Sequence, residues 1–121
     1  MELIYTRHLV ASGATSDETR YLPTFRKMRL TKVMLVPNSA TADNSSNYLT
    51  LSVKNGSTTV ASRTTQSAAL AAGVSETLTL SGGEALNYED LGEIELKKTH
   101  SGTGATCDVE FLLVFEPARD F

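Results

Sequence analysis

Strict alternation of apolar and polar residues in the second half of the chain restricts the fold more than any other feature. Every second residue from Leu49 to Val53 is apolar, and the residues between them are hydroxyl-bearing. A period of two is that of a β-strand with one buried face. The pair Asn55-Gly56 follows, and both residues tolerate the positive φ of a two-residue hairpin turn. We therefore expect an antiparallel hairpin whose second strand is 57–63.

The same period predicts further strands along the chain. They are Leu3 to Val10, Phe25 to Val36, Thr77 to Ser81, Glu93 to Lys97 and Thr106 to Phe115. In the last of them Leu112 and Val114 make the second face apolar as well, so this strand should be central and covered on both faces by protein or by a neighbouring subunit. Helical periodicity is weak, and only 66–72 fits a turn of helix, with a loop as the equal alternative.

Strands separated by turns, without alternating helices, are typical of an all-β protein. We expect an antiparallel β-sandwich of about seven to eight strands, with a jelly roll as one topology of that class. The 121 residues suffice for a single domain, 1–121. Within it, residues 25–117 are expected to form the sandwich, 1–24 an N-terminal arm or first strand, and 118–121 a tail. The polar stretches 12–24 and 37–47 are predicted to be long loops, the first of them extended as an arm.

Side chains that catalysis or metal binding requires are scarce. The two histidines, His8 and His100, stand among 12 Ser and 16 Thr, so a serine near a histidine is expected by chance and neither is assigned a catalytic role. The single Cys107 excludes an intramolecular disulfide and a multi-cysteine metal site, and we interpret it as an inert core thiol. We predict no catalytic, cofactor-binding or metal-ligating residue, no cofactor, no small-molecule substrate and no enzyme.

Charge and hydropathy exclude further partners. A net charge of −3 argues against nucleic acid. No apolar run approaches the roughly 20 residues of a membrane-spanning helix, and no signal peptide is visible, which predicts no membrane and synthesis in a cytosol. Bases concentrate in the first 32 residues, whereas residues 76–95 hold six acids and no base. This polarity predicts assembly between a basic and an acidic surface, with two ordinary solvated faces as the alternative.

Turn and strand positions between about residues 33 and 117 also carry a resemblance. They are Asn55-Gly56, Ala72-Gly73-Val74-Ser75, Leu78, Leu80, Leu91-Gly92, Ile94, Leu96 and Gly102-Thr103-Gly104. In this pattern the chain resembles the β-sandwich head decoration (cement) proteins and other small structural proteins of tailed bacteriophages. The usual Gly-Asp turn before the penultimate strand of that family is Leu91-Gly92-Glu93 here.

The resemblance implies a virion protein that binds the outside of an assembled phage capsid and stabilises it. The implied partner is the major capsid protein, the implied state a homotrimer, and the implied location the capsid surface after synthesis in the host bacterial cytoplasm. A phage tail component or a receptor- or carbohydrate-binding β-sandwich module is the alternative. Because residues 1–32 carry most of the bases and lie outside the sandwich pattern, we expect capsid or inter-subunit contacts there and at the C-terminus. The residues predicted for these contacts are Arg7, Arg20, Arg26, Lys27, Arg29 and Phe121.

Overall fold

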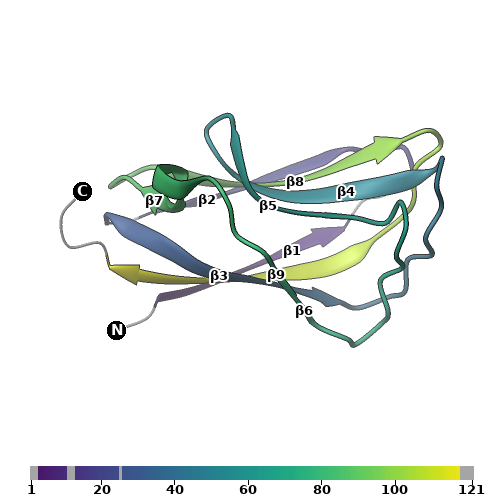
Figure 1. The fold of residues 1–121 in the computed structure, drawn as a ribbon, viewed down its shortest axis with the longest axis horizontal. Helices are drawn as coiled ribbons and strands as arrows, with labels where there is room; N and C mark the ends of the chain where they lie inside the picture. The colour runs from purple at the N-terminus through teal and green to yellow at the C-terminus, as the bar shows by residue number, and fades with distance from the viewer. Residues whose placement is uncertain (1–2, 11–12, 25, 118–121) are drawn as a thin grey trace.

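Two antiparallel sheets stacked face to face make up nearly all of the protein (Figure 1). The computed structural model describes residues 3–10, 13–24 and 26–117. In chain order its elements are β1 (Leu3–Val10), β2 (Glu18–Pro23), β3 (Met28–Pro37), β4 (Tyr48–Asn55), β5 (Thr58–Thr64), β6 (Glu76–Leu78), the short 3₁₀ helix η1 (Gly83–Leu86), β7 (Asn87–Tyr88), β8 (Glu93–Ser101) and β9 (Asp108–Pro117). No helix in this described part is long and apolar enough to cross a membrane.

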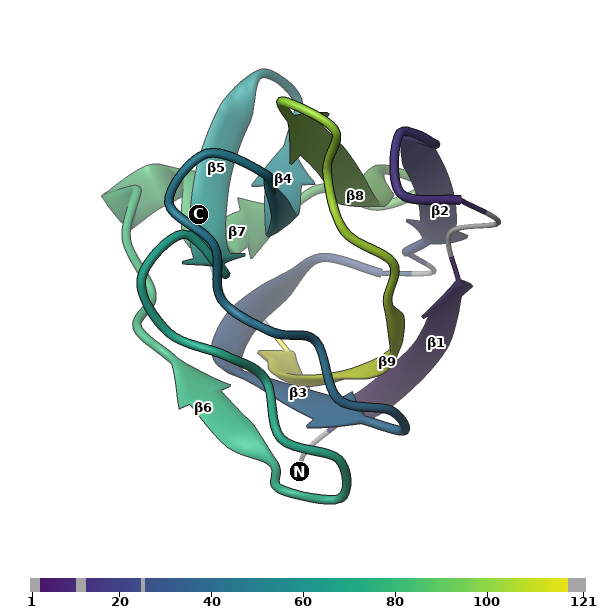
Figure 2. The same cartoon turned by 90° about the vertical axis from the view of Figure 1, so that its right-hand side faces the viewer.

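The strand order is that of a jelly roll. One sheet has the order β1-β9-β3-β6, with the short β7 also on β3, and the other has the order β2-β8-β4-β5. First and last strands pair, β1 with β9, and so do β2 with β8, β3 with β6, and β4 with β5. The chain is thus a long hairpin that folds back on itself and rolls up, as Figure 2 shows end-on. The predicted all-β sandwich is confirmed, and its topology is the jelly roll.

The core fills the space between the sheets with alternate residues from each strand. Fully buried side chains come from β3, β4, β8 and β9, namely Met28, Leu30, Val33, Leu35, Leu49, Leu51, Val53, Ile94, Leu96, Val109, Phe111, Leu113 and Phe115. At one end the ring of Phe115 packs edge-on against Tyr5 at 5.4 Å and Tyr88 at 5.6 Å between centroids. The strands β4, β8 and β9 therefore bury the face that their period-two pattern predicts. In β3 a register shift between Leu30 and Lys32 moves the buried positions from Leu30 to Val33.

The hairpin and the central strand are confirmed in particular. Gly56, with φ of 60°, turns the chain between β4 and β5, because glycine adopts this conformation without steric penalty. β9 lies between β1 and β3, with unbroken register to β1 from Val10 opposite Asp108 to Leu3 opposite Phe115.

The main departure from prediction lies in residues 12–24. β1 matches the strand predicted at Leu3 to Val10, whereas β2 is a strand of the second sheet in part of the stretch expected to be a loop. Its pattern is hidden because two of its three core-side positions are Glu18 and Arg20, which pair with each other at the sheet edge. The other expected stretch, 37–47, is a loop apart from an isolated bridge at Thr41.

The helical turn expected as one alternative at 66–72 does not form, and that segment is the loop that was the other alternative. The only helix in the described residues is η1, four residues after a left-handed Gly82. β6 ends at Leu78, three residues before the predicted end of its strand at Ser81.

Candidate interaction surfaces

The side chains that catalysis or metal binding would use are dispersed in the described residues. They hold no group of three or more His, Cys, Asp or Glu side chains that could bind a metal ion. Cys107 is buried in the core, as expected. His100 Nδ1 lies 2.7 Å from Asp17 Oδ1, which also accepts the His100 backbone N–H at 2.9 Å. This hydrogen bonding holds the pKa of Asp17 below its ordinary value. The side chain of His8 lies outside the described residues.

A buried lysine fastens the segment before β2 to β8. Lys98 is fully buried, and its ammonium donates to the carbonyl oxygens of Ser16 at 2.6 Å and Ala14 at 3.1 Å. Each such charge-assisted bond is stronger than a neutral one. Lys98 shares strand parity with Ile94 and Leu96, and this parity is the sequence signal that places it inside. The role of the lysine is structural.

The outer face of the β1-β9-β3-β6 sheet carries a group of apolar residues, bordered by the exposed Thr6, Lys32 and Glu110. Leu112 lies opposite Met34, and Val114 lies opposite Ile4. Ile4 is 61% exposed, Met34 and Leu112 are half-buried, and Val114 is only 8% exposed. No described segment of the chain lies over the outer side of β1, β9 and β3 (Figures 1 and 2). We call Ile4, Met34, Val36, Leu112 and Val114 the apolar face. A contiguous exposed apolar patch on a small protein marks a site of interaction.

The outer face of the other sheet has the opposite character. Ser52 lies between Ser62 on β5 and Lys97 on β8, and Thr50 lies between Thr64 and Thr99 in the next row. We call these six residues the polar face. It carries hydroxyls and charges of the kind that water solvates well, so the two broad sides of the molecule differ sharply in polarity.

The basic residues predicted for contacts are spread over several elements. Arg7 is exposed on the edge strand β1. Arg20 on β2 pairs with Glu18, and Arg29 on β3 donates to Asn87 Oδ1 at 2.8 Å. Arg26 and Lys27 are exposed in the loop before β3. Phe121 lies outside the described residues.

The acidic and basic segments meet at one end of the sandwich. Thr24 N donates to Gly92 O at 3.0 Å, and Leu91 N donates to Thr24 O at 3.0 Å. The loop that carries Arg26 therefore lies beside the turn that carries Glu89 and Asp90. The acidic turn and this part of the basic segment are thus neighbours in the structure. The tip of this turn is Leu91, whose side chain is 78% exposed.

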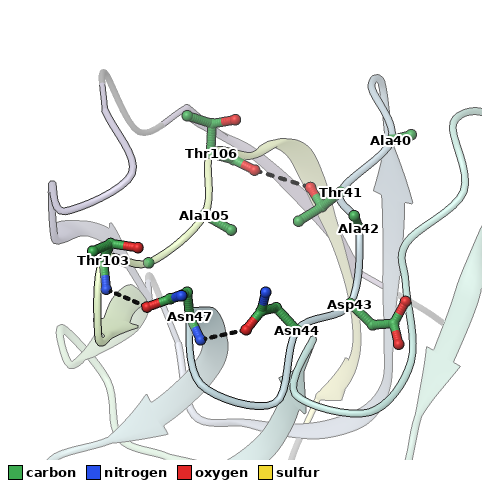
Figure 3. A pocket seen from close by; sticks show the side chains of 10 residues that line it. Ala40, Thr41, Ala42, Asp43, Asn44, Asn47, Thr103, Ala105 and Thr106 are labelled. Carbon is green, nitrogen blue, oxygen red and sulfur yellow. Dashed lines mark hydrogen bonds between the residues drawn. The ribbon is translucent and has the colours of Figure 1, made fainter.

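A pocket of about 410 Å³ opens at the opposite end, between the β3–β4 loop and the β8–β9 turn (Figure 3). Thr41 Oγ1 donates to Thr106 O at 3.0 Å, and Thr103 N donates to Asn47 Oδ1 at 2.8 Å, which ties its two walls together. Asn44 Oδ1 accepts the backbone N–H of Asn47 at 2.8 Å, and the Asn44 amide nitrogen points into the space in Figure 3. The pocket thus offers neutral donors, small methyl groups and the Asp43 carboxylate, without an aromatic side chain among its lining residues.

Sequence reasoning missed two of these features. The apolar outer side of β9 was visible in Leu112 and Val114, but its continuation onto Ile4 and Met34 needed the strand order. The exposed Leu91 was missed as well. The only sequence signal for its positive φ is that Leu91-Gly92-Glu93 replaces the usual Gly-Asp turn.

Comparison with known proteins finds only remote structural similarity. No protein-family model and no curated protein sequence matches the chain. A chain of infectious bursal disease virus Gx strain has a TM-score of 0.43 and 12% identity over 100% of this chain and 34% of that one. A chain of Desmodium yellow mottle tymovirus has a TM-score of 0.35 and 8% identity over 100% and 90%. The VP2 subviral particle of infectious bursal disease virus gives 0.37 and 12% over 98% and 38%. The present chain thus spans little more than a third of the bursal disease virus chains.

Proposed function

We propose that the protein is a structural virion protein that binds the outer surface of an assembled phage capsid as a homotrimer and stabilises it. Its partner in this role is the major capsid protein, and its place is the capsid surface after synthesis in the host bacterium. The resemblance of residues 33–117 to phage decoration proteins supports this class of partner. The observation that carries the proposal is the apolar face, which this chain leaves uncovered.

The contrast between the two broad sides suits a protein that lies flat on a larger surface. With the apolar face against the shell, Ile4 and Met34 lose contact with water, while the polar face, with residues such as Ser52 and Lys97, stays solvated. Burial of apolar area is the main favourable contribution to such an association, at about 25 cal/mol per Å².

The size of the face explains why several copies would bind together. The three strands that carry it, β1, β9 and β3, have a spacing of about 4.8 Å and a length of about 27 Å, so they offer roughly 390 Å² per copy, about half of the roughly 800 Å² per partner of a standard stable interface. Three linked copies together exceed that area. Linking also raises the effective concentration of the second and third faces once the first has bound.

Stabilisation then follows by mass action. A ligand that binds the assembled lattice but not its separated subunits lowers the free energy of the assembled state by RT ln(1 + [L]/Kd). At a free concentration one hundred times Kd this amounts to about 2.7 kcal/mol per site. The protein needs no catalytic group for this function.

Co-sedimentation with expanded phage capsids tests the proposal. The wild-type protein should pellet with the capsids, and Met34→Asp, which places a carboxylate in the centre of the apolar face, should reduce pelleting at least tenfold. Ser52→Asp, the matched change on the polar face, should have no effect. Removal of residues 1–20 is unsuitable, because it deletes β1 and part of β2 from the two sheets. Equal pelleting of the Met34 and Ser52 variants would refute the proposed orientation.

A receptor- or carbohydrate-binding module is the second candidate, and the pocket is the observation that favours it. Its amides, hydroxyls and methyl groups match the neutral hydroxyls and C–H surfaces of a sugar. A glycan array with the wild-type protein and Asn44→Leu tests this candidate. Binding of a glycan that the variant loses would support it, and an empty array would leave only the structural role.

A further inference from the structure

Leu91 combines an unfavourable backbone conformation with an exposed apolar side chain. Its φ of 59° is the only positive φ of a non-glycine residue among those described. It is the third residue of a turn closed by Gly92 N donating to Glu89 O at 3.2 Å. A positive φ at that position defines a turn that favours glycine or asparagine. Leucine pays a steric penalty there and buries nothing in this chain, since its side chain is 78% exposed.

Hydrogen bonds to Thr24 hold the turn that carries Leu91 in place. The buried Thr24 donates its hydroxyl to Glu89 O at 2.6 Å and accepts Gly92 N–H at 2.8 Å. Its own backbone N–H and carbonyl bond to Gly92 and Leu91. The exposed leucine is therefore fixed in place before any partner arrives, which reduces the entropy lost on binding.

Charges of both signs flank this leucine. Glu89 and Asp90 precede it in the turn and are exposed, and Arg26 is exposed two residues after Thr24. Among the described residues none of these three side chains takes part in a salt bridge or hydrogen bond that would neutralise it within the chain. An anionic rim and a cation thus lie side by side on one end of the molecule, both available to another molecule.

We infer that Leu91 is an inter-subunit anchor, and that the partner is a second copy of this chain. In the homotrimer, the Leu91 side chains of the three copies cluster on the threefold axis. Around this cluster the Glu89 and Asp90 carboxylates of each copy face Arg26 of the next. The inference rests on the homotrimer of the proposed function and names the surface that forms it.

Charge complementarity favours a second copy as partner. In a closed ring each copy contacts the next head to tail, so two different patches must match. The acidic turn and the Arg26 loop are two such patches, and the hydrogen bonds of Thr24 fix their relative position. The same ring leaves the apolar face of every copy free for the capsid.

Substitution of Leu91 separates assembly from folding. Leu91→Gly removes the anchor and relieves the backbone strain, so the thermal midpoint of the monomer should be unchanged or raised while the association constant for the trimer falls at least tenfold. Leu91→Asn, also compatible with a positive φ, should dissociate the trimer similarly. Val74→Ser is the matched control, since Val74 is 55% exposed at the opposite end of the sandwich. Mass from sedimentation velocity gives the oligomeric state. A monomeric wild-type protein, or a Leu91→Gly variant that associates like the wild type, overturns the inference.

A charge swap tests the rim. Asp90→Arg and Arg26→Glu should each weaken the trimer, and the double variant should restore it to within about threefold of the wild type; a double variant weaker than both singles contradicts the pairing.

Co-sedimentation of the same samples separates this inference from the proposed function. If the wild-type trimer fails to bind capsids but Leu91→Gly dissociates it, the capsid role fails and the anchor stands. If the wild-type protein binds capsids and Leu91→Gly remains trimeric, the anchor fails and the capsid role stands.

Discussion

Removal of one buried hydroxyl should destabilise the whole protein, because Thr24 joins the end of β2 to the turn before β8. Thr24 is fully buried, and its Oγ1 donates to Glu89 O at 2.6 Å and accepts the N–H of Gly92 at 2.8 Å. Thr24→Val keeps the shape of the side chain but replaces the hydroxyl with a methyl group. Both backbone groups then lose a partner without any change in packing volume.

The loss in free energy of unfolding depends on the hydrogen bonds that remain in the Thr24→Val protein. A buried polar group left without a partner costs about 1–3 kcal/mol. Gly92 N and Glu89 O still bond to each other at 3.2 Å, so neither group is wholly unpaired and the loss should be about 2 kcal/mol. For a domain of 121 residues that corresponds to a fall in Tm of roughly 6–10 °C.

Equilibrium unfolding in urea measures this change directly. The midpoint should fall at an unchanged m-value, because stability and not compactness is altered. Thr24→Ser, which keeps the hydroxyl, should recover most of the loss. Thr50→Val, on the solvent-facing polar face, is the matched control and should change the free energy of unfolding by less than about 0.5 kcal/mol. A Thr24→Val protein as stable as the Thr50→Val protein would refute the assignment of Thr24 as the residue that secures the turn.

Three further predictions concern other parts of the fold. Gly104→Ala should lower the free energy of unfolding by more than about 2 kcal/mol in thermal unfolding, because at φ +69° a Cβ would lie 2.0 Å from a backbone oxygen. Gly73→Ala is the control: at φ +75° in open space it should lower the free energy of unfolding by only about 1 kcal/mol. The pKa of Asp17 lies below 3.8 in the folded chain because of its hydrogen bond with His100. The contribution of this bond to stability is therefore present above about pH 4 and is lost as the pH falls through the folded pKa. Carboxyl NMR titration should show the low pKa, and His100→Ala should return it to about 3.8. Burial raises the pKa of Tyr88 far above its ordinary value, so in an absorbance titration one of the four tyrosines should ionise only on unfolding, and its replacement by phenylalanine should abolish that step.

The strands themselves were largely predictable, because apolar residues at every second position show which side chains share a face. It placed Leu51 and Val53 in the core and Ser52 outside, and Asn55-Gly56 located the hairpin turn. The two-sided apolar pattern of Leu112 and Val114 correctly indicated a central strand. These signals are local, since side-chain alternation and turn conformation depend on neighbours in the chain.

β2 escaped prediction for a physical reason. Glu18 and Arg20 occupy core-side positions at the sheet edge, where they neutralise each other, and such a strand has no apolar periodicity to detect. The loop predicted at 12–24 was the consequence of this gap. The burial of Lys98, one residue beyond the strand predicted at Glu93 to Lys97, was not predicted either; it depends on carbonyl partners from the segment before β2.

By itself, the sequence determined that the chain is an all-β sandwich and which side of most strands faces the core. Only the tertiary structure decided which strands are neighbours. A strand of suitable length can pair with many others, and the choice is made only when the two sheets and their connecting loops form one closed structure. That pairing joins Ile4 and Met34 across β9 into one apolar face. It also brings Arg26 beside Asp90 and leaves Leu91 exposed, although more than 60 residues separate the loop from the turn. The candidate surfaces are therefore products of long-range pairing, which local patterns do not encode.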